Sequence, residues 1–279
     1  MSSISPSFEH DPRILAKYIF YGAKFYWGMG LLAKIIGAGF GIYFIAEKVT
    51  SSLAPGSIVI LAIGSEFCQW RSDILKGRAE GITRKVEYQD AFGWNFPTKD
   101  LSDQLTKIPA KKRAEIAQAV KDNYFASKEP QSPKRAMENL QESAWWSKEL
   151  AGTMLALCSI IMVIFLLGTL AMFSVSINTI RDYGALQSVN RVITSILSLL
   201  VSLGLIKTVV GYYNFSRKAE QTEQATIVLL KSNPVDEKDA IRLLHDYQLG
   251  RASAPLIPDW LWKLRAPTLN DLWKKYRQS

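Results

Sequence analysis

Long apolar stretches interrupt an otherwise polar chain, and the clearest of them covers residues 150–173. This stretch runs 24 residues without a charged side chain. At about 1.5 Å per residue, a helix of this length reaches about 36 Å, which exceeds a hydrocarbon core of about 30 Å. The pattern therefore predicts a transmembrane helix in the middle of the chain.

Further apolar stretches at residues 29–46, 57–68 and 192–213 predict three more membrane spans. The second stretch is short, but Leu53 and Trp70 extend it to the depth of the membrane interface. Spans joined by short links pack as antiparallel hairpins. The predicted fold class is therefore all-α: a polytopic membrane protein with four transmembrane helices in two hairpins and helical cytoplasmic extensions.

The polar segments divide the rest of the chain. The predicted regions are an interfacial amino-terminal helix at 1–28, hairpin 1 at 29–70, a cytoplasmic helical region at 71–148, hairpin 2 at 149–213 and a cytoplasmic helical tail at 214–279. The central region at 71–148 ends in an amphipathic helix that runs directly into the 150–173 span. Trp145 and Trp146 mark the membrane interface there. The tail predicts two short amphipathic helices separated by Pro267, packed on the soluble part or on the lipid headgroups.

Basic residues fix the predicted orientation. Lys and Arg number 15 in residues 71–148 and 11 in residues 214–279, against one each in the links 47–52 and 174–190. Cytoplasmic loops carry the excess of positive charge, so both termini and the central region are expected in the cytoplasm. Topology and anionic lipids also account for the net charge of +9, and no DNA or RNA polymer is expected as a partner.

Small residues suggest how the first span packs. Gly37 and Gly41 are one helical turn apart, which leaves a surface that another helix can approach closely. Cys68 and Cys158 both fall in or beside apolar segments. We interpret them as small buried side chains and not as a disulfide pair.

The sequence contains little that suggests catalysis. His10 and His245 are its only histidines, and no metal-ligand spacing, phosphate-binding glycine loop or nucleophile motif occurs. We therefore expect no enzyme activity, no catalytic residue, no metal site and no cofactor.

Two charged residues lie inside predicted spans. Glu66 precedes Trp70 by about one turn, and Lys207 lies in the last span. Both can reach the cytoplasmic interface, which would make them ordinary snorkelling charges. Alternatively they face a shared interior, as a pair that lines or gates a pathway, because charges in hydrocarbon are costly and are usually retained for function.

Basic residues mixed with aromatic ones suggest a ligand site. Cations can meet phosphates while aromatic rings stack on a base. The candidate residues are Arg71, Arg78, Arg84, Lys85, Tyr88, Trp94, Lys134 and Arg135. Attraction to lipid headgroups is the alternative explanation for the same cations.

The arrangement of two spans, a basic helical insert, two spans and a tail resembles a known family. The residues that carry the resemblance are Glu138-Asn139-Leu140-Gln141-Glu142-Ser143 with the following Trp145 and Trp146, and Pro258-Asp259-Trp260 in the tail. They resemble the bacterial SMODS-associating four-transmembrane effector family of cyclic-nucleotide anti-phage signalling. The resemblance implies a multi-pass inner-membrane protein that senses a cyclic di- or oligonucleotide second messenger, forms homo-oligomers among membrane lipids and permeabilises the membrane.

Two other classes of function remain open from the sequence. A constitutive small-ion channel or transporter would use Glu66 and Lys207 without responding to a nucleotide. A membrane-anchored scaffold would use the basic surface and the aromatic tail to hold a cytoplasmic partner.

Overall fold

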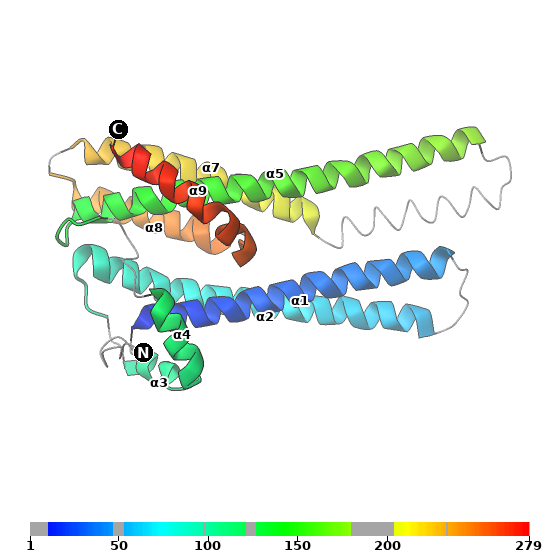
Figure 1. Ribbon diagram of the computed structural model, residues 1–279, viewed down its shortest axis with the longest axis horizontal. Helices are drawn as coiled ribbons and strands as arrows, with labels where there is room; N and C mark the ends of the chain where they lie inside the picture. The colour runs from blue at the N-terminus through cyan, green and yellow to red at the C-terminus, as the bar shows by residue number, and fades with distance from the viewer. Residues whose placement is uncertain are drawn as a thin grey trace. The chain divides into compact units, whose positions relative to one another are not determined.

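The computed structural model describes residues 11–46, 53–96, 99–120, 127–179, 204–232 and 234–278. Within these ranges the regular structure is α-helical and no strand is present (Figure 1). The helices are α1 (Pro12–Ala46), α2 (Leu53–Phe92), α3 (Lys99–Leu105), α4 (Ala110–Val120), α5 (Pro133–Thr179), α7 (Leu205–Leu230), α8 (Glu237–Ser253) and α9 (Asp259–Gln278). The prediction of an all-α fold is confirmed.

Helices α1 and α2 join polar and apolar segments without a break. α1, of 35 residues, unites the predicted interfacial segment with the first apolar stretch, and α2 continues beyond the second stretch for a total of 40 residues. α2 ends at Gly93, whose φ is 73° and whose N donates to the carbonyl of Gln89 at 3.0 Å. Glycine enters this left-handed conformation at little cost, so it ends the helix here.

α5 is one helix of 47 residues. It contains both the predicted amphipathic helix and the 150–173 stretch, which confirms that the two are continuous. The sequence predicts a polar link from residue 174, but the helix continues to Thr179. Residues 174–179 include no glycine or proline, so nothing local interrupts the hydrogen bonding of the helix.

One helix among the described residues is long and apolar enough to cross a membrane, and it lies within Pro133–Ala171. Its most apolar window has a mean hydropathy of 2.6 and is 22% buried, unlike the core helix of a soluble protein. This supports association of the chain with a membrane. The stretches 29–46 and 57–68 lie in α1 and α2 and are not confirmed as spans, and residues 192–203 lie outside the described residues.

Contacts divide the chain into two units. The first comprises Met1–Lys24, Asp73–Gly152 and Asn214–Ser279, and the second comprises Phe25–Ser72 and Thr153–Tyr213. The sequence predicts the corresponding boundaries after residues 28, 70, 148 and 213. The predicted central region therefore packs with the start of α1 and with the tail, as parts of one unit.

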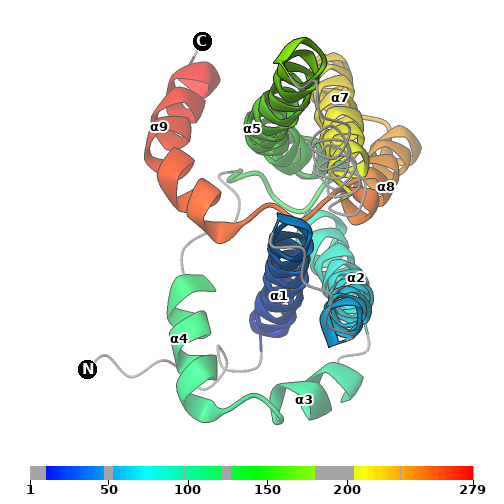
Figure 2. The same ribbon diagram turned by 90° about the vertical axis from the view of Figure 1, so that its right-hand side faces the viewer.

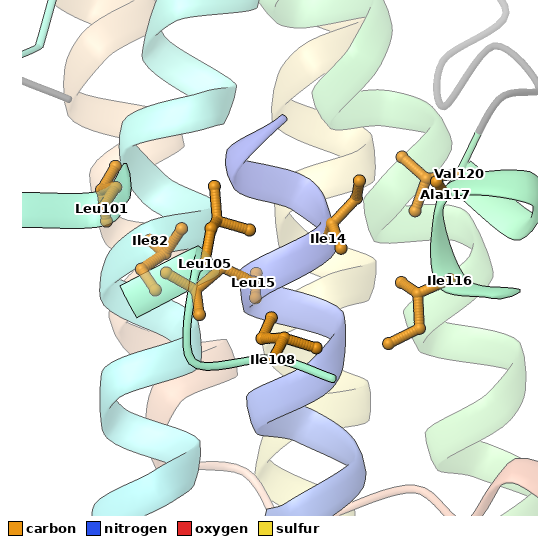
Figure 3. Close-up of a cluster of buried hydrophobic side chains, with 10 residues drawn as sticks. Ile14, Leu15, Ile82, Leu101, Leu105, Ile108, Ile116, Ala117 and Val120 are labelled. Carbon is orange, nitrogen blue, oxygen red and sulfur yellow. The ribbon is translucent and has the colours of Figure 1, made fainter. Parts of the chain in front are cut away.

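A cluster of buried apolar side chains holds α3 and α4 against α1 and α2 in the first unit. Figure 3 shows Ile14 and Leu15 of α1 between side chains of α2 and α3 on one side and of α4 on the other. The cluster comprises Ile14, Leu15, Ala16, Ile82, Leu101, Leu105, Ile108, Ile116, Ala117 and Val120. Each large side chain buried in this way stabilises the fold by about 1.5–3 kcal/mol. The start of α1 is thereby anchored.

The polar ends of α5 and α7 pack on α8. Figure 2 shows α8 beside both helices. Tyr247 of α8 is 1% exposed, its ring centroid lies 6.2 Å from that of Phe215, and its hydroxyl donates to the carbonyl of Ser143 at 3.0 Å. Tyr247 therefore joins three helices of the first unit.

The tail forms one helix, and the predicted division into two short helices at Pro267 is wrong. α9 spans 20 residues with Pro267 inside it. A proline within a helix removes one hydrogen bond and costs about 3 kcal/mol. However, Leu261, Leu269 and Trp273 form one buried stripe on both sides of the proline. Burial of this stripe outweighs the missing hydrogen bond, and the exposed side of the helix accommodates the proline ring.

Candidate functional site

α1 and α5 begin in the same way, with a capping residue followed by proline. The Oδ1 of Asp11 accepts a hydrogen bond from the N of Arg13 at 2.8 Å. The Oγ of Ser132 accepts one from the N of Arg135 at 3.2 Å. A side-chain acceptor before the helix and a proline at its first position are the preferred combination at a helix start. The Asp-Pro and Ser-Pro pairs therefore determine where these helices begin.

Both helix starts line one cavity in the first unit, with a volume of about 570 Å³. This volume is in the range of small-molecule sites. The lining residues are Asp11, Pro12, Arg13, Val86, Gln89, Asp90, Ser127, Lys128, Gln131 and Arg135. Three of these side chains are cationic and two are anionic, and helix starts also favour negative charge. The cavity is suited to an anionic ligand such as a phosphate ester.

Arg135 links α5 to α2 across the wall of the cavity. Its Nε and Nη2 donate to the two carboxylate oxygens of Asp90, at 3.1 and 2.8 Å. The Nδ2 of Asn139, one turn further along α5, also donates to Asp90, at 2.8 Å. Hydrogen bonding to Asp90 raises the pKa of Arg135, although burial opposes it. This forked geometry is the one in which arginine also binds phosphates.

The other charged residues of the cavity differ in how they are held. Arg13 donates from Nε and Nη2 to Oδ2 of Asp11, at 2.8 and 2.6 Å. Lys128 is exposed. An anionic ligand would therefore compete with Asp11 and Asp90 for their arginines and would meet Lys128 as a further cation.

Of the eight ligand residues predicted from the sequence, Arg135 is the one that lines this cavity. Lys134 is exposed, and its Nζ lies 2.8 Å from Oε1 of Glu129. Arg78 and Lys85 are exposed on α2. Arg71 belongs to the second unit. The structure therefore does not gather the predicted cations into one site.

The predicted aromatic residues form their own group. The rings of Tyr88 and Trp94 stack with centroids 5.0 Å apart and an interplanar angle of 5°, and Phe92 lies beside both. Burial and the charge of Glu87 raise the pKa of Tyr88. Arg84 lies near enough to Tyr88 to act on its pKa in the opposite direction. None of these side chains lines the cavity.

The second unit contains an ion pair that the sequence did not indicate. The Nζ of Lys34 on α1 lies 2.9 Å from Oε1 of Glu66 on α2. The partner of Glu66 is therefore a lysine of the same hairpin, and Lys207 is exposed on α7. At Gly37, a methyl group would lie 3.5 Å from Cβ of Leu61, so α1 and α2 are in contact there. The surroundings of Gly41 lie outside the described part of the structure.

A buried charge cluster joins α2 to α8 in the first unit. Glu80 and Glu87 are 3% and 6% exposed, and both accept hydrogen bonds from Arg251, while Gln248 donates to Glu87 at 2.7 Å. Burial lowers the pKa of Arg251, but the charges of Glu87 and Glu80 outweigh burial and hold it well above its usual value. The spacing of the two glutamates on one face of α2 is the signal in the sequence that could have indicated a partner helix.

Lys76, on the same face of α2, holds the end of α8. Its Nζ donates to the carbonyl of Ala252 at 2.8 Å and also to that of Ala254. A cation at a helix C-terminus satisfies free carbonyls and is favoured by the helix dipole. Burial lowers the pKa of Lys76, and the negative charges of Glu80 and Asp73 oppose this effect. This charge is therefore structural.

Comparison of the chain with protein-family models, curated proteins and solved structures finds no match. Among the described residues there is also no group of side chains arranged to hold a metal ion.

Proposed function

We propose that this protein is a membrane effector that binds a small anionic ligand, of the cyclic-nucleotide class, and then permeabilises the bilayer. In this proposal it crosses a bacterial inner membrane four times with both termini in the cytoplasm. Four spans per subunit are too few for a wide channel, so the pathway forms between copies of the chain.

The continuity of α5 is the observation that carries the proposal. The helix begins at the cavity, where Arg135 binds Asp90, and runs without a break into the apolar stretch that starts at Leu150. From Arg135 to Leu150 the helix covers about 22 Å. A change at the cavity wall can therefore reach the proposed membrane-spanning part through a single continuous helix.

The donors in the cavity support an anionic ligand. A phosphate that binds Arg135 takes the place of Asp90 in the same forked geometry, with Lys128 as a second donor. Displacement of Asp90 from Arg135 weakens the contact of α5 with α2 at this point, where Asn139 also donates to Asp90. The ligand then favours whichever arrangement of α5 binds it more tightly, and the populations shift accordingly.

Two measurements on the full chain test the proposal. Calorimetry in nanodiscs should detect binding of cyclic dinucleotides, and liposomes that contain the protein should release a trapped dye only when the nucleotide is added. Lys128→Ala should weaken binding by about 10- to 150-fold, because a charge-assisted hydrogen bond contributes about 1.5–3 kcal/mol. Lys134→Ala is the matched control, since Lys134 is exposed and binds Glu129 outside the cavity. Absence of binding to every cyclic nucleotide would reject direct sensing.

The Lys34–Glu66 pair favours a second candidate function, a constitutive small-ion channel. Ionisable side chains within apolar segments are typical of ion pathways. The same liposomes distinguish the two functions: leak without nucleotide that is lost in Glu66→Gln indicates the channel. Nucleotide-dependent leak that survives this substitution indicates the effector.

A further inference from the structure

α9 has a buried apolar stripe and several exposed apolar side chains. Leu261, Leu269 and Trp273 are buried within the first unit. The exposed apolar side chains near the start of the helix are Trp260, Trp262 and Leu264, which are 53%, 52% and 69% exposed, and they project from more than one side of it. Large apolar side chains grouped on the surface in this way indicate an interaction site.

Contacts at both ends of α9 fix its position along the long helices. At its start, Asp259 forms an ion pair with Lys24 of α1. Near its end, the ring of Trp273 lies 5.3 Å from that of Trp145 of α5, and Tyr276 stacks on Trp145 at 6.5 Å. Figures 1 and 2 show α9 beside α5. The tail is therefore fastened to the two helices that lead into apolar stretches.

The two attachment points lie at the same distance from those apolar stretches. Lys24 precedes the stretch at 29–46, and Trp145 precedes the one at 150–173, each by about 7 Å along the helix. The polar headgroup layer on one side of a bilayer is about 5–8 Å thick. If the stretches lie in the hydrocarbon, Lys24 and Trp145, the residues that α9 contacts, lie at headgroup depth.

We infer that the exposed apolar side chains of α9 bind the lipid headgroup layer of the bilayer that the chain enters. Tryptophan is enriched at this depth because its ring is apolar and its N–H is polar. α9 also carries five basic and two acidic residues, and Lys263 lies among the exposed aromatic residues. Its charge suits a surface with anionic lipids. The inference rests on membrane insertion, one part of the proposed function, and is independent of ligand binding.

Oxidation by hydroxyl radicals, mapped by mass spectrometry on the unaltered chain, tests the inference. The protein is placed at one copy per nanodisc, in phosphatidylethanolamine and phosphatidylglycerol. Trp260 and Trp262 should react at least about five-fold more slowly than Trp94, because lipid shields side chains at headgroup depth. Trp94 is the internal reference, since it is 41% exposed in the same unit. Equal rates for the three residues would overturn the inference.

A pair of single-cysteine labelling experiments, in a chain whose Cys68 and Cys158 are both replaced by alanine, gives an independent test. Leu264→Cys and Val228→Cys replace apolar side chains that are 69% and 67% exposed, and α7 carries the second. In the same nanodiscs a membrane-impermeant maleimide should label position 228 at least about five-fold faster than position 264. Equal labelling contradicts the inference. Protection of position 264 that appears only with several copies per disc also contradicts it, because a second copy is then the occupant.

The protection of α9 by lipid and the nucleotide-dependent release of dye can each fail without the other. Dye release that depends on nucleotide, together with unprotected Trp260 and Trp262, rejects the lipid contact of α9 and leaves the effector function in place. Protected tryptophans without nucleotide binding reject the effector function and retain the lipid contact.

Discussion

The guanidinium of Arg251 on α8 holds the carboxylate of Glu87 on α2 through two hydrogen bonds, from Nη1 to Oε1 at 2.6 Å and from Nη2 to Oε2 at 3.2 Å. Its Nε also donates to Glu80 at 2.9 Å. Arg251 is one cation between two buried carboxylates, so its loss removes this cation from both, and Glu87 keeps its hydrogen bond from Gln248. The pairing therefore specifies how α8 docks on α2.

Arg251→Met should destabilise the first unit by about 3–5 kcal/mol, because it leaves the buried carboxylates of Glu80 and Glu87 without the Arg251 cation. Thermal unfolding of the protein in nanodiscs, followed by circular dichroism, measures the effect. Arg217→Met is the matched control, since Arg217 and Glu220 form an exposed pair on α7 whose loss should change stability little. Similar melting temperatures for the two variants would show that the cluster contributes no more than a surface pair.

Gly93→Ala should destabilise the fold by about 1–2 kcal/mol, because alanine is strained at the φ of 73°. A Cβ at this position would also lie 2.6 Å from Oε1 of Gln131, whose side chain would have to leave the carbonyl of Gln89. Gly77→Ala provides a control of opposite sign. Gly77 lies inside α2 with nothing near its Cβ position, so alanine should stabilise the helix by up to about 1 kcal/mol. Thermal unfolding of the two variants tests both signs.

The course of the long helices could be predicted from the sequence because it depends on local patterns. An amphipathic segment that runs directly into an apolar stretch predicts the continuous α5. The predicted division of the tail at Pro267 was wrong for a physical reason. Its local cost is real, but the buried stripe on α9 is a tertiary effect that appears only when the partner surface is known.

The candidate cavity could be predicted in part. Arg135 was predicted to bind a ligand from its charge, whereas Asp11, Arg13 and Lys128 were not. They meet Arg135 because two helices start at the same place, and the sequence does not reveal this convergence. Charge alone also does not distinguish Arg135, held by Asp90, from the exposed Arg78 and Lys85.

Gly30 is predicted to be more sensitive to substitution than Gly37. A Cβ at Gly30 would lie 3.1 Å from the carbonyl oxygen of Ser65 and 3.4 Å from Cβ of Cys68. Gly30→Ala should therefore separate α1 from α2 and cost about 1–3 kcal/mol. Gly37→Ala should be near neutral, because its Cβ would meet Leu61 at ordinary contact distance. Denaturant titration in mixed micelles compares the two, and equal losses would contradict the assigned contacts.

Tyr88 should make stability depend on alkaline pH. Its pKa lies above the ordinary value of 10.0, because burial and Glu87 disfavour the phenolate. The fold therefore favours the neutral phenol, and this stabilisation is complete below pH 10 and lost as pH rises through the raised pKa. The melting temperature of Tyr88→Phe should decrease less between pH 9 and pH 11 than that of the unaltered chain. These pH values lie about one unit on either side of the unperturbed pKa. An unchanged decrease would show that other groups account for it.

The Lys34–Glu66 pair should couple α1 to α2 in the second unit. Glu66→Gln leaves the Lys34 ammonium without its anion, and the Lys34 side chain is 17% exposed. Lys34→Met leaves the Glu66 carboxylate, which is 71% exposed, so this substitution should reduce stability less than Glu66→Gln does. In a double-mutant cycle the coupling should be about 1 kcal/mol, typical of polar contacts between helices in a membrane.

Exchange of the charges at Lys34 and Glu66 distinguishes the contribution of charge attraction to stability from that of side-chain packing. Lys34→Glu combined with Glu66→Lys should recover most of the stability lost in Glu66→Gln, because the opposite charges remain adjacent. Lys207→Met should give an additive change with either single variant, since Glu66 pairs with Lys34. Both results come from denaturant titrations in mixed micelles. Coupling of Glu66 to Lys207 equal to its coupling to Lys34 would instead place all three charges on one pathway, as the channel function requires.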